Sequence, residues 1–518
     1  MSTRASKLVL TLLAGAAAAA TAGATGSADT RARERGESAL KPASTRNAPG
    51  LGPRRAERWA RPKFRCRGVK VRPGARTIQH AVDAHRARTT YCLQGGVYRL
   101  AAPIVPKTGD VFVGRPKTVI NGSKLLTGWR SYRRHIWYVD GQGENDVLRS
   151  GTCTPSAYAG CRDANDVYYD DRALRRVMSL GRLGPGTFYF DHASRRIYVG
   201  SNPRNHKVEV AVTKFAWQGI GVGAYDVVIK GVTVEKFATS LQSAAIHGGR
   251  GWLVEGVEAR LNHGAGMDGA TRMRNNYVHD NGQAGLGGSG PMTVDGNEIA
   301  WNNYSRVCPC WEAGGAKWAN GSNVSVTDNY VHDNRGPGLW TDGSESHIRV
   351  ARNRVERNSD AGIVIEISYD ATVANNVVRR NATLRRGWCQ SGGIVVAESP
   401  RVEVFGNTVS RNGDGICLTQ QDRGTDAVRG PHRLQDVDVH DNTVVMTAGH
   451  SGLIQYVGDT SYYTSRNNRF RNNTYHLGCS KRPYFIWMRP TSSGYGEMSF
   501  ASWRAAGQDV DGAATRRC

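Results

Sequence analysis

Three residues with reactive side chains recur at nearly the same interval in the second half of the chain: Lys317, Asp342 and Glu366. Two neighbouring carboxyl groups can act as nucleophile and acid/base when a glycosidic bond is hydrolysed. A lysine beside them can instead remove a proton α to a uronate carboxylate, which begins a β-elimination. Carboxylate oxygens are also ligands of Ca²⁺. All three chemistries require that these residues lie side by side.

Each of these residues lies in a short segment that starts with a glycine followed by an apolar residue. Side chains alternate along a strand, so we expect the first residue after the glycine to point inward and the second and fourth to point to solvent. The aligned glycines are Gly266, Gly285, Gly315, Gly338, Gly362, Gly393, Gly415 and Gly452. The outward positions hold Asp268, Lys317, Trp340, Asp342 and Glu366, and also His247 if Ala245 stands in the glycine position.

Successive coils of such strands, about 4.8 Å apart, would place Lys317, Asp342 and Glu366 in one patch with Trp340 beside them. Two stacked carboxylates repel unless a cation, a shared proton or a substrate group lies between them. An outward tryptophan suits stacking against a sugar ring. We therefore take the three charged residues as candidate catalytic residues and Trp340 as a substrate-binding residue. A purely structural ion-pair set is the alternative.

Residues around this patch are further candidates. Asp268 and His247 are candidate substrate-binding residues, and Glu312 is a candidate rim residue. Tyr369 follows Glu366 closely, and it either binds sugar hydroxyls or only forms the turn. The candidate Ca²⁺ ligands are Asp268, Asp342 and Glu366, and no other cofactor is expected. Extra residues at 297–315, 376–393 and 415–442 predict three loops around the strand face.

An internal repeat decides the fold. From about residue 225 the chain repeats apolar-x-apolar-x-x-Asn-x-Val-x-x-Asn, then glycine and apolar residues, in units of the low twenties with insertions. Such strands cannot bury both faces alone, and stacked coils solve this by forming one continuous apolar interior. Asparagine tolerates left-handed backbone angles, and its amide can bond the coils above and below. The first asparagine of each unit recurs at Asn276, Asn297, Asn329, Asn353, Asn376, Asn407, Asn442 and Asn468.

These repeats resemble the right-handed parallel β-helix proteins of the pectin-lyase-like superfamily. Residues 77–82 and 96–98 look like the helical cap and first coil of that fold, residues 181–205 like a small β insertion, and residues 499–509 like its closing segment. The resemblance implies an all-β, single-stranded right-handed parallel β-helix solenoid over residues 66–512, with an N-terminal helical cap. The implied insertion covers about residues 123–214, and residues 513–518 are left as a C-terminal tail.

The N-terminal residues read as a secretory signal over residues 1–24. Arg4 and Lys7 are followed by an apolar run at 8–20 and small residues at 22–24, which indicates a secreted, extracellular protein. Residues 25–65 are basic and lack periodicity, so we expect a flexible linker attracted to anionic polymers.

The chain has ten cysteines, an even number that suits structural disulfides in an exported protein. Cys66 and Cys92, and likewise Cys153 and Cys161, are close enough in sequence to pair. The Cys308-Pro309-Cys310 segment is too tight for a typical zinc hook.

Composition excludes several classes of protein. The 518 residues include 39% hydrophobic and 22% charged residues, which excludes wholesale disorder. No apolar run is long enough to span a bilayer, so no membrane span is expected. The formal net charge of +25 suits an acidic polysaccharide as partner. A nucleic-acid partner is not expected, because no recognition motif accompanies the positive charge.

Three functions remain open. The first, slightly favoured by the lysine and the basic chain, is a polysaccharide lyase acting on a uronate-containing glycan, with Lys317 as base. The second is a retaining glycoside hydrolase that uses Asp342 and Glu366 as nucleophile and acid/base. The third is a non-catalytic β-helix that binds glycan or builds a surface structure, because fold alone does not establish activity.

Overall fold

The computed structural model describes residues 54–143, 151–154, 159–383, 389, 391–480, 482–487 and 496–516. They all belong to one compact unit that spans Thr45–Cys518. The predicted signal segment, residues 1–24, lies outside the described residues. No helix in the described ranges is long and apolar enough to cross a membrane.

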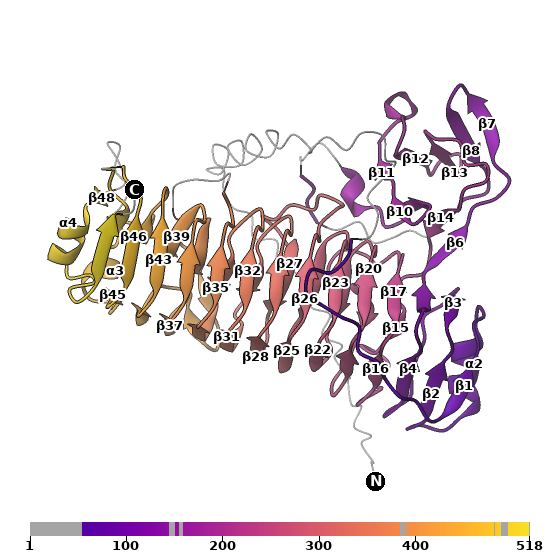
Figure 1. Cartoon of the computed structure of the whole chain (residues 1–518), viewed down its shortest axis with the longest axis horizontal. Coiled ribbons are helices and arrows are strands. Elements are labelled where there is room, and N and C mark those ends of the chain that lie inside the picture. The colour runs from indigo at the N-terminus through magenta and orange to yellow at the C-terminus, as the bar shows by residue number, and fades with distance from the viewer. Residues whose placement is uncertain are drawn as a thin grey trace, which may run out of the picture. The chain divides into compact units, whose positions relative to one another are not determined.

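Three long sheets, parallel except for the last strand pair of sheet 2, make up most of this unit (Figure 1). Sheet 1 runs over thirteen strands from β1 (Val69–Val71) to β45 (Arg469–Arg471), and sheet 3 over thirteen from β3 (Gly96–Arg99) to β49 (Ala513–Arg516). Sheet 2 consists of β15 (Trp217–Gln218), β18 (Ala244–His247), β21 (Ala265–Asp268), β24 (Ala284–Gly288), β27 (Gly314–Ala319), β30 (Leu339–Asp342), β33 (Ile363–Glu366), β36 (Gly392–Ala397), β39 (Asp414–Gln420), β44 (Ser451–Gln455), β47 (Phe485–Trp487) and β48 (Glu497–Met498). These strands give the stacked coils that the repeat predicts.

Coils in the middle of the stack contribute one strand to every sheet, as in β27, β28 (Ser322–Thr327) and β29 (Tyr330–His332). Inward positions of the three strands meet in a continuous core that contains Ala316, Val326 and Val331. Because each strand pairs in register with the same strand of the next coil, an outward residue on one coil lies beside the outward residue on the next.

A ladder of buried asparagines follows one corner of the coils. The side-chain amide of Asn329 donates to the Asn353 side-chain oxygen at 2.9 Å, and Asn329 accepts from Asn297 in the same way. The predicted ladder is confirmed from Asn276 to Asn442, but its next member is Asn473 rather than Asn468. Asn468 instead donates to the carbonyls of Leu434 and Tyr462.

The left-handed backbone conformation of this corner lies one residue before the ladder asparagine. Asp328 has φ 57° and Arg352 has φ 57°, whereas Asn329 and Asn353 do not have positive φ. The side chain of each asparagine is thereby free to bond along the stack, and the preceding residue makes the bend. A second ladder runs through Asn262, Asn281, Asn302, Asn334, Asn358, Asn381 and Asn412.

Both ends of the core are covered by short helices. Helix α2 (Thr77–Ala84) buries Ile78 and Val82 at the N-terminal end, as the cap prediction requires. Helix α4 (Phe500–Ala505) buries Trp503 at the other end, where the indole N–H donates to Asp509 at 2.9 Å. The predicted C-terminal tail is wrong for residues 513–516, because β49 pairs in parallel with β46 (Thr474–Leu477).

The insertion lies between β6 (Ser123–Leu125) and β14 (Val208–Ala211), which pair with each other. It has its own small core, which includes Phe188, Ile197 and Val210. Its second sheet contains β7 (Arg130–Arg133), β8 (Ile136–Val139), β12 (Thr187–Asp191) and β13 (Arg196–Val199).

The predicted disulfides Cys66–Cys92 and Cys153–Cys161 are present. Between cysteines of the described residues, two more pairs join Cys308 to Cys310 and Cys389 to Cys417.

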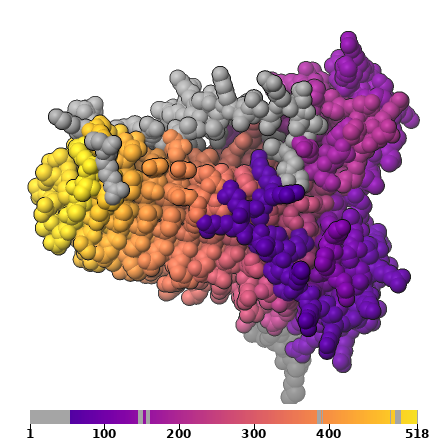
Figure 2. All heavy atoms as spheres, viewed as in Figure 1, coloured from indigo at the N-terminus to yellow at the C-terminus, as the bar shows by residue number. Residues whose placement is uncertain are grey.

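Residues 54–65, which we call the strap, lie against sheet 3 rather than forming the end of a free linker. In Figure 2 the indigo atoms of the strap lie over the pink coils. The Glu298 carboxylate accepts hydrogen bonds from three consecutive backbone N–H groups, those of Glu57, Arg58 and Trp59, at 2.6–2.7 Å. Burial opposes the charge of Glu298, but the hydrogen bond with His332, followed by these three backbone bonds, holds its pKa below the usual value.

Ion pairs fix both ends of the strap. Arg54 pairs with Asp280 at 3.1 Å, and Arg61 pairs with Glu258 at 2.6 Å. The prediction that residues 25–65 form a flexible linker is therefore wrong for the described part of that segment.

We predict that Asn329→Ala destabilises the protein by about 2–4 kcal/mol, because the amide groups of the neighbouring ladder asparagines lose a buried partner. Urea unfolding followed by circular dichroism measures the change. The matched control is Ser325→Ala, which alters an outward side chain on the preceding strand β28. Equal stability of the two variants would contradict the structural role of the ladder.

We also predict that Glu298→Gln releases the strap, because a neutral amide offers one oxygen to three backbone donors. Limited trypsin digestion should then cleave after Arg54, Arg55 or Arg58 faster than in the unmodified protein. Glu403→Gln is the control, since Glu403 lies on β37 (Val402–Phe405) of sheet 1 and pairs with His440. Unchanged cleavage in Glu298→Gln would show that the strap is held by other contacts.

Candidate active site

The outer face of sheet 2 brings together the three predicted catalytic residues. Lys317 on β27 is the register partner of Trp340 on β30. Asp342 ends β30 and Glu366 ends β33, and their preceding residues Thr341 and Ile365 are partners. The alternation predicted from the glycine-led segments therefore holds on these three coils.

These residues form one chain of polar contacts. The Lys317 ammonium lies 2.7 Å from the Asp342 carboxylate and 3.8 Å from the centre of the Trp340 ring. The Trp340 indole N–H donates to Glu366 at 3.0 Å. The side chains are 12% exposed at Lys317, 17% at Asp342 and 19% at Glu366. All three are therefore largely buried but keep some contact with solvent.

Two loops add groups from either end of the strands. In the loop before β27 the Trp311 carbonyl accepts a hydrogen bond from Lys317 at 3.3 Å. A hairpin formed by β40 (Thr425–Asp426) and β41 (Gly430–Pro431) is preceded by Arg423, which pairs with Glu366 at 2.5 Å. Loops at 297–315 and 415–442 are thus placed where the insertions predicted them, and part of 376–393 lies outside the described residues.

A third carboxyl group, Glu398, lies beside Glu366 and was not predicted. It directly follows Ala397, the register partner of Glu366, and its side chain accepts a hydrogen bond from the backbone N–H of Gln421 at 2.9 Å. Glu398 is only 1% exposed, and this burial, followed by the negative charge of Glu366, raises its pKa to about 8. The site therefore keeps a carboxylic acid protonated at neutral pH next to a carboxylate.

Sequence reasoning missed Glu398 for a geometric reason. Strict alternation assigns the fifth residue after Gly393 to the interior, but Glu398 has φ 47° and leaves the strand. One indication of Glu398 was present in the sequence: an acidic residue directly follows Ala397, the outward position that lies next to Glu366 on the following coil. Arg423 was missed because it comes from an irregular loop, whose path the repeat does not determine.

His247 and Asp268 lie on the same face as Lys317. His247 is three coils before Lys317 in the stack, and Asp268 is two coils before it. The His247 ring nitrogen Nδ1 lies 2.7 Å from Asp268. Burial opposes a charge on His247, but the hydrogen bond to Asp268 outweighs it and raises the histidine pKa. Burial also raises the pKa of Asp268 despite the histidine, so the pair holds its shared proton tightly.

The remaining predicted residues lie at the margin of this face. Glu312 hydrogen-bonds Gln242 through its carboxylate and accepts from Gln283 through its backbone carbonyl, which places it in the loop that carries Trp311. Tyr369 is fully buried, and its hydroxyl donates to the Gly430 carbonyl at 2.6 Å. The structure thus places Tyr369 under the hairpin, where it supports that loop instead of facing a ligand.

The predicted Ca²⁺ ligands do not converge. Asp268 on β21 and Asp342 on β30 are three coils apart, a separation of about 14 Å at the usual strand spacing. One ion cannot bridge that distance, so the set of Asp268, Asp342 and Glu366 is corrected.

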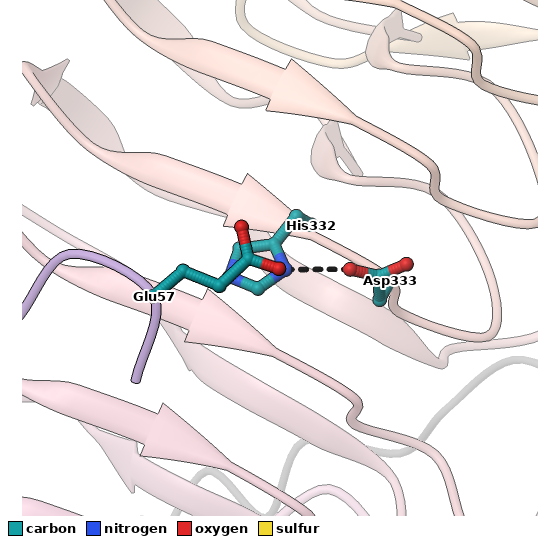
Figure 3. A group of neighbouring side chains, drawn as sticks. All are labelled: Glu57, His332 and Asp333. Atoms are coloured by element: carbon teal, nitrogen blue, oxygen red, sulfur yellow. Dashed lines mark hydrogen bonds and ion pairs between the residues drawn. The ribbon is translucent and has the colours of Figure 1, made fainter. Parts of the chain in front are cut away.

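Another cluster, Glu57, His332 and Asp333, has the spacing of a metal site (Figure 3). Its central position is already taken by the Arg357 guanidinium, which lies 2.9 Å from Glu57 and 2.8 Å from Asp333. The hydrogen bonds to Asp333 and Glu298 outweigh burial and raise the pKa of His332, as expected for an imidazole among carboxylates. This cluster joins the strap to sheet 3.

Comparison with known proteins agrees with the architecture. Residues 226–387 match the family model of the right-handed β-helix region. The fold is a right-handed parallel β-helix. No curated protein sequence matches the chain.

Several solved structures are similar. A complex of XylC with xylose has a TM-score of 0.60 and 15% identity, over 79% of this chain and 84% of that one. A protein described as a glycoside hydrolase has a TM-score of 0.44 and 12% identity, over 73% and 89% of the two chains. The A-module of the Azotobacter vinelandii mannuronan C-5 epimerase AlgE6 has a TM-score of 0.38 and 13% identity, over 85% and 94%. At these identities the likeness concerns the fold.

The raised pKa of Glu398 predicts a pH-dependent stability. Its folded pKa of about 8 lies above the ordinary value of 4.5, so its contribution is full below about pH 4.5 and is lost as the pH rises through 8. Relative to Glu398→Gln, which is neutral at every pH, the unmodified protein should lose melting temperature between pH 5 and pH 9. A constant difference between the two melting temperatures over this range would show that Glu398 does not titrate there.

Proposed function

We propose that this protein is a retaining glycoside hydrolase acting on an uncharged glycan, with Asp342 as nucleophile and Glu366 as acid/base. The observation that carries the proposal is the pair of outward carboxylates on adjacent rungs, each with a different set of partners. Rungs about 4.8 Å apart suit the carboxyl separation of about 5–5.5 Å that retaining enzymes use.

The surroundings of the two carboxylates support this division of roles. Asp342 pairs with the Lys317 ammonium and accepts a hydrogen bond from the backbone N–H of Gly343 at 2.7 Å. Both contacts stabilise the ionised carboxylate that a nucleophile requires. Glu366 lies next to Glu398, whose raised pKa means that a proton is stored beside it at neutral pH. Two carboxyl groups with separated proton affinities are what acid/base catalysis needs.

The reaction then follows two balanced steps. In the first, an oxygen of Asp342 bonds to the anomeric carbon, the glycosidic bond breaks, and the leaving oxygen takes a proton that Glu398 has passed to Glu366, so that Glu366 is left as a carboxylate. In the second, water attacks the anomeric carbon as the ester bond to Asp342 breaks, and Glu366 takes the proton of that water. The Trp340 indole and Arg423 orient Glu366.

Local charge favours a neutral glycan over the acidic one expected from the total charge of the chain. Lys317 is matched by Asp342, and Arg423 is matched by Glu366. No unmatched cation among these four residues is left to bind a uronate carboxylate. The lyase alternative also needs a free amine on Lys317, yet this nitrogen donates to Asp342 and to the Trp311 carbonyl. We further propose that the enzyme is secreted, which suits its disulfides.

We predict that Asp342→Asn and Glu366→Gln lower turnover of oligosaccharides by at least about 10³-fold, because each removes a group that takes part in bond making or proton transfer. With 2,4-dinitrophenyl glycosides, whose leaving group needs no acid, Glu366→Gln should show a burst and, with azide, form a glycosyl azide of retained configuration. Asp342→Asn should show no burst and form no azide of retained configuration. Proton NMR of the first product should report retained configuration. Glu403→Gln, on sheet 1, is the control.

Three outcomes would contradict this proposal. Inverted configuration would remove the nucleophile role of Asp342. Formation of an unsaturated uronate from an acidic polysaccharide, lost in Lys317→Ala, would establish the lyase instead. Absence of turnover over a broad panel of glycosides and polysaccharides, with glycan binding retained, would favour the non-catalytic β-helix.

A further inference from the structure

The outward row of sheet 2 has a gap beside the candidate catalytic residues. In register, the row runs His247, Asp268, Gly287, Lys317 and Trp340. Gly287 is the one member of these five without a side chain. Asp268 and Lys317 therefore stand on either side of it on strands about 9.6 Å apart, twice the usual rung spacing.

Neighbouring side chains do not fill this gap. A methyl group placed on Gly287 would meet the Lys317 carbonyl oxygen at 3.1 Å, and no side chain of the described residues lies within 4 Å of it. Lys317 is drawn away from Gly287, toward Asp342 and the Trp340 ring on the next coil. Asp268 is drawn the opposite way, toward His247 on the preceding coil. Both flanking side chains thus point away from Gly287 along the stack, and the space over this glycine stays open.

The walls of the gap carry hydrogen-bonding groups but little net charge. On one side the His247–Asp268 pair shares a proton, and Phe215 stacks on the histidine ring at 5.2 Å and 15°. The bond to His247 uses Nδ1 and one Asp268 oxygen, Oδ1. On the other side Lys317 is matched by Asp342. Groups of this kind bind hydroxyls, and neither side offers an unmatched charge to a uronate or an amino sugar.

We infer that the rung of Gly287 is a sugar subsite that holds one uncharged pyranose ring between the His247–Asp268 pair and Lys317. This inference rests on the proposed function, and it specifies where the glycan chain extends from the bond that is cleaved. The ring lies on the N-terminal side of Asp342, and its hydroxyls are recognised by His247 and Asp268. The subsite makes the enzyme select oligosaccharides with a neutral residue at that position.

The test measures binding separately from turnover. Isothermal titration calorimetry of the Glu366→Gln full chain, which keeps the Lys317–Asp342 pair beside the gap, with xylotetraose, cellotetraose and tetragalacturonate gives Kd with little hydrolysis. Adding Gly287→Leu, which fills the gap, should raise Kd for the neutral tetrasaccharide that binds by at least about tenfold. Ser325→Leu, which adds the same side chain at an outward position of sheet 1, should leave Kd unchanged and controls for folding. Melting temperatures of both variants are compared first.

A second variant covers the case in which Gly287→Leu does not fold. Asp268→Asn keeps the shape of the side chain but alters its hydrogen bonding with His247, and it should weaken the same neutral tetrasaccharide about threefold or more. The inference is overturned if both variants bind as tightly as the parent, if tetragalacturonate binds more tightly than the neutral sugars, or if none of the three binds. If a neutral tetrasaccharide binds in this pattern but the unmodified chain releases no sugar, the subsite stands and the proposed hydrolase fails.

Discussion

The in-register stacking of identical corners is the constraint on which this structure depends. A left-handed residue makes the bend, and the next residue, a buried asparagine, bonds the coils before and after it. An error of one residue in this register would turn every outward side chain of a coil inward. The ladders therefore do more than hold coils together, because they also decide which side chains line up on the outer faces.

The candidate active site is a direct product of that register. Lys317, Trp340, Asp342 and Glu366 come from three strands that are short and otherwise ordinary, and they meet because the coils are stacked without slippage. A rigid ladder can hold like charges close together at low conformational cost. The repulsion among the carboxyl groups is offset by the cations that pair with Asp342 and Glu366. It is also reduced because a third carboxyl group, Glu398, stays protonated.

The sequence was sufficient for the parts that follow periodicity. The alternation after each glycine placed Lys317, Asp342 and Glu366 on one face, and the asparagine repeat gave the coil length. Prediction from the sequence failed where the chain departs from the repeat. Asn473 takes the place expected for Asn468 in the ladder, and Glu398 does not follow the strand alternation because its φ is left-handed. Arg423 comes from the loop that leads into the hairpin. Tyr369 was a candidate for binding sugar hydroxyls because it follows Glu366 closely, but its hydroxyl is bonded to the same hairpin. Such contacts depend on loop paths, which neighbouring residues do not determine.

The strap has a consequence for how the chain folds. Its backbone donors bind Glu298, which follows them by about 240 residues, so this contact has a very high sequence separation. Closing so long a loop costs entropy that is recovered only after the intervening coils have assembled. The earliest described residues are therefore among the last to reach their final positions. In a partly synthesised chain the strap cannot yet bind Glu298. The strap reaches its final position only when the middle coils are complete.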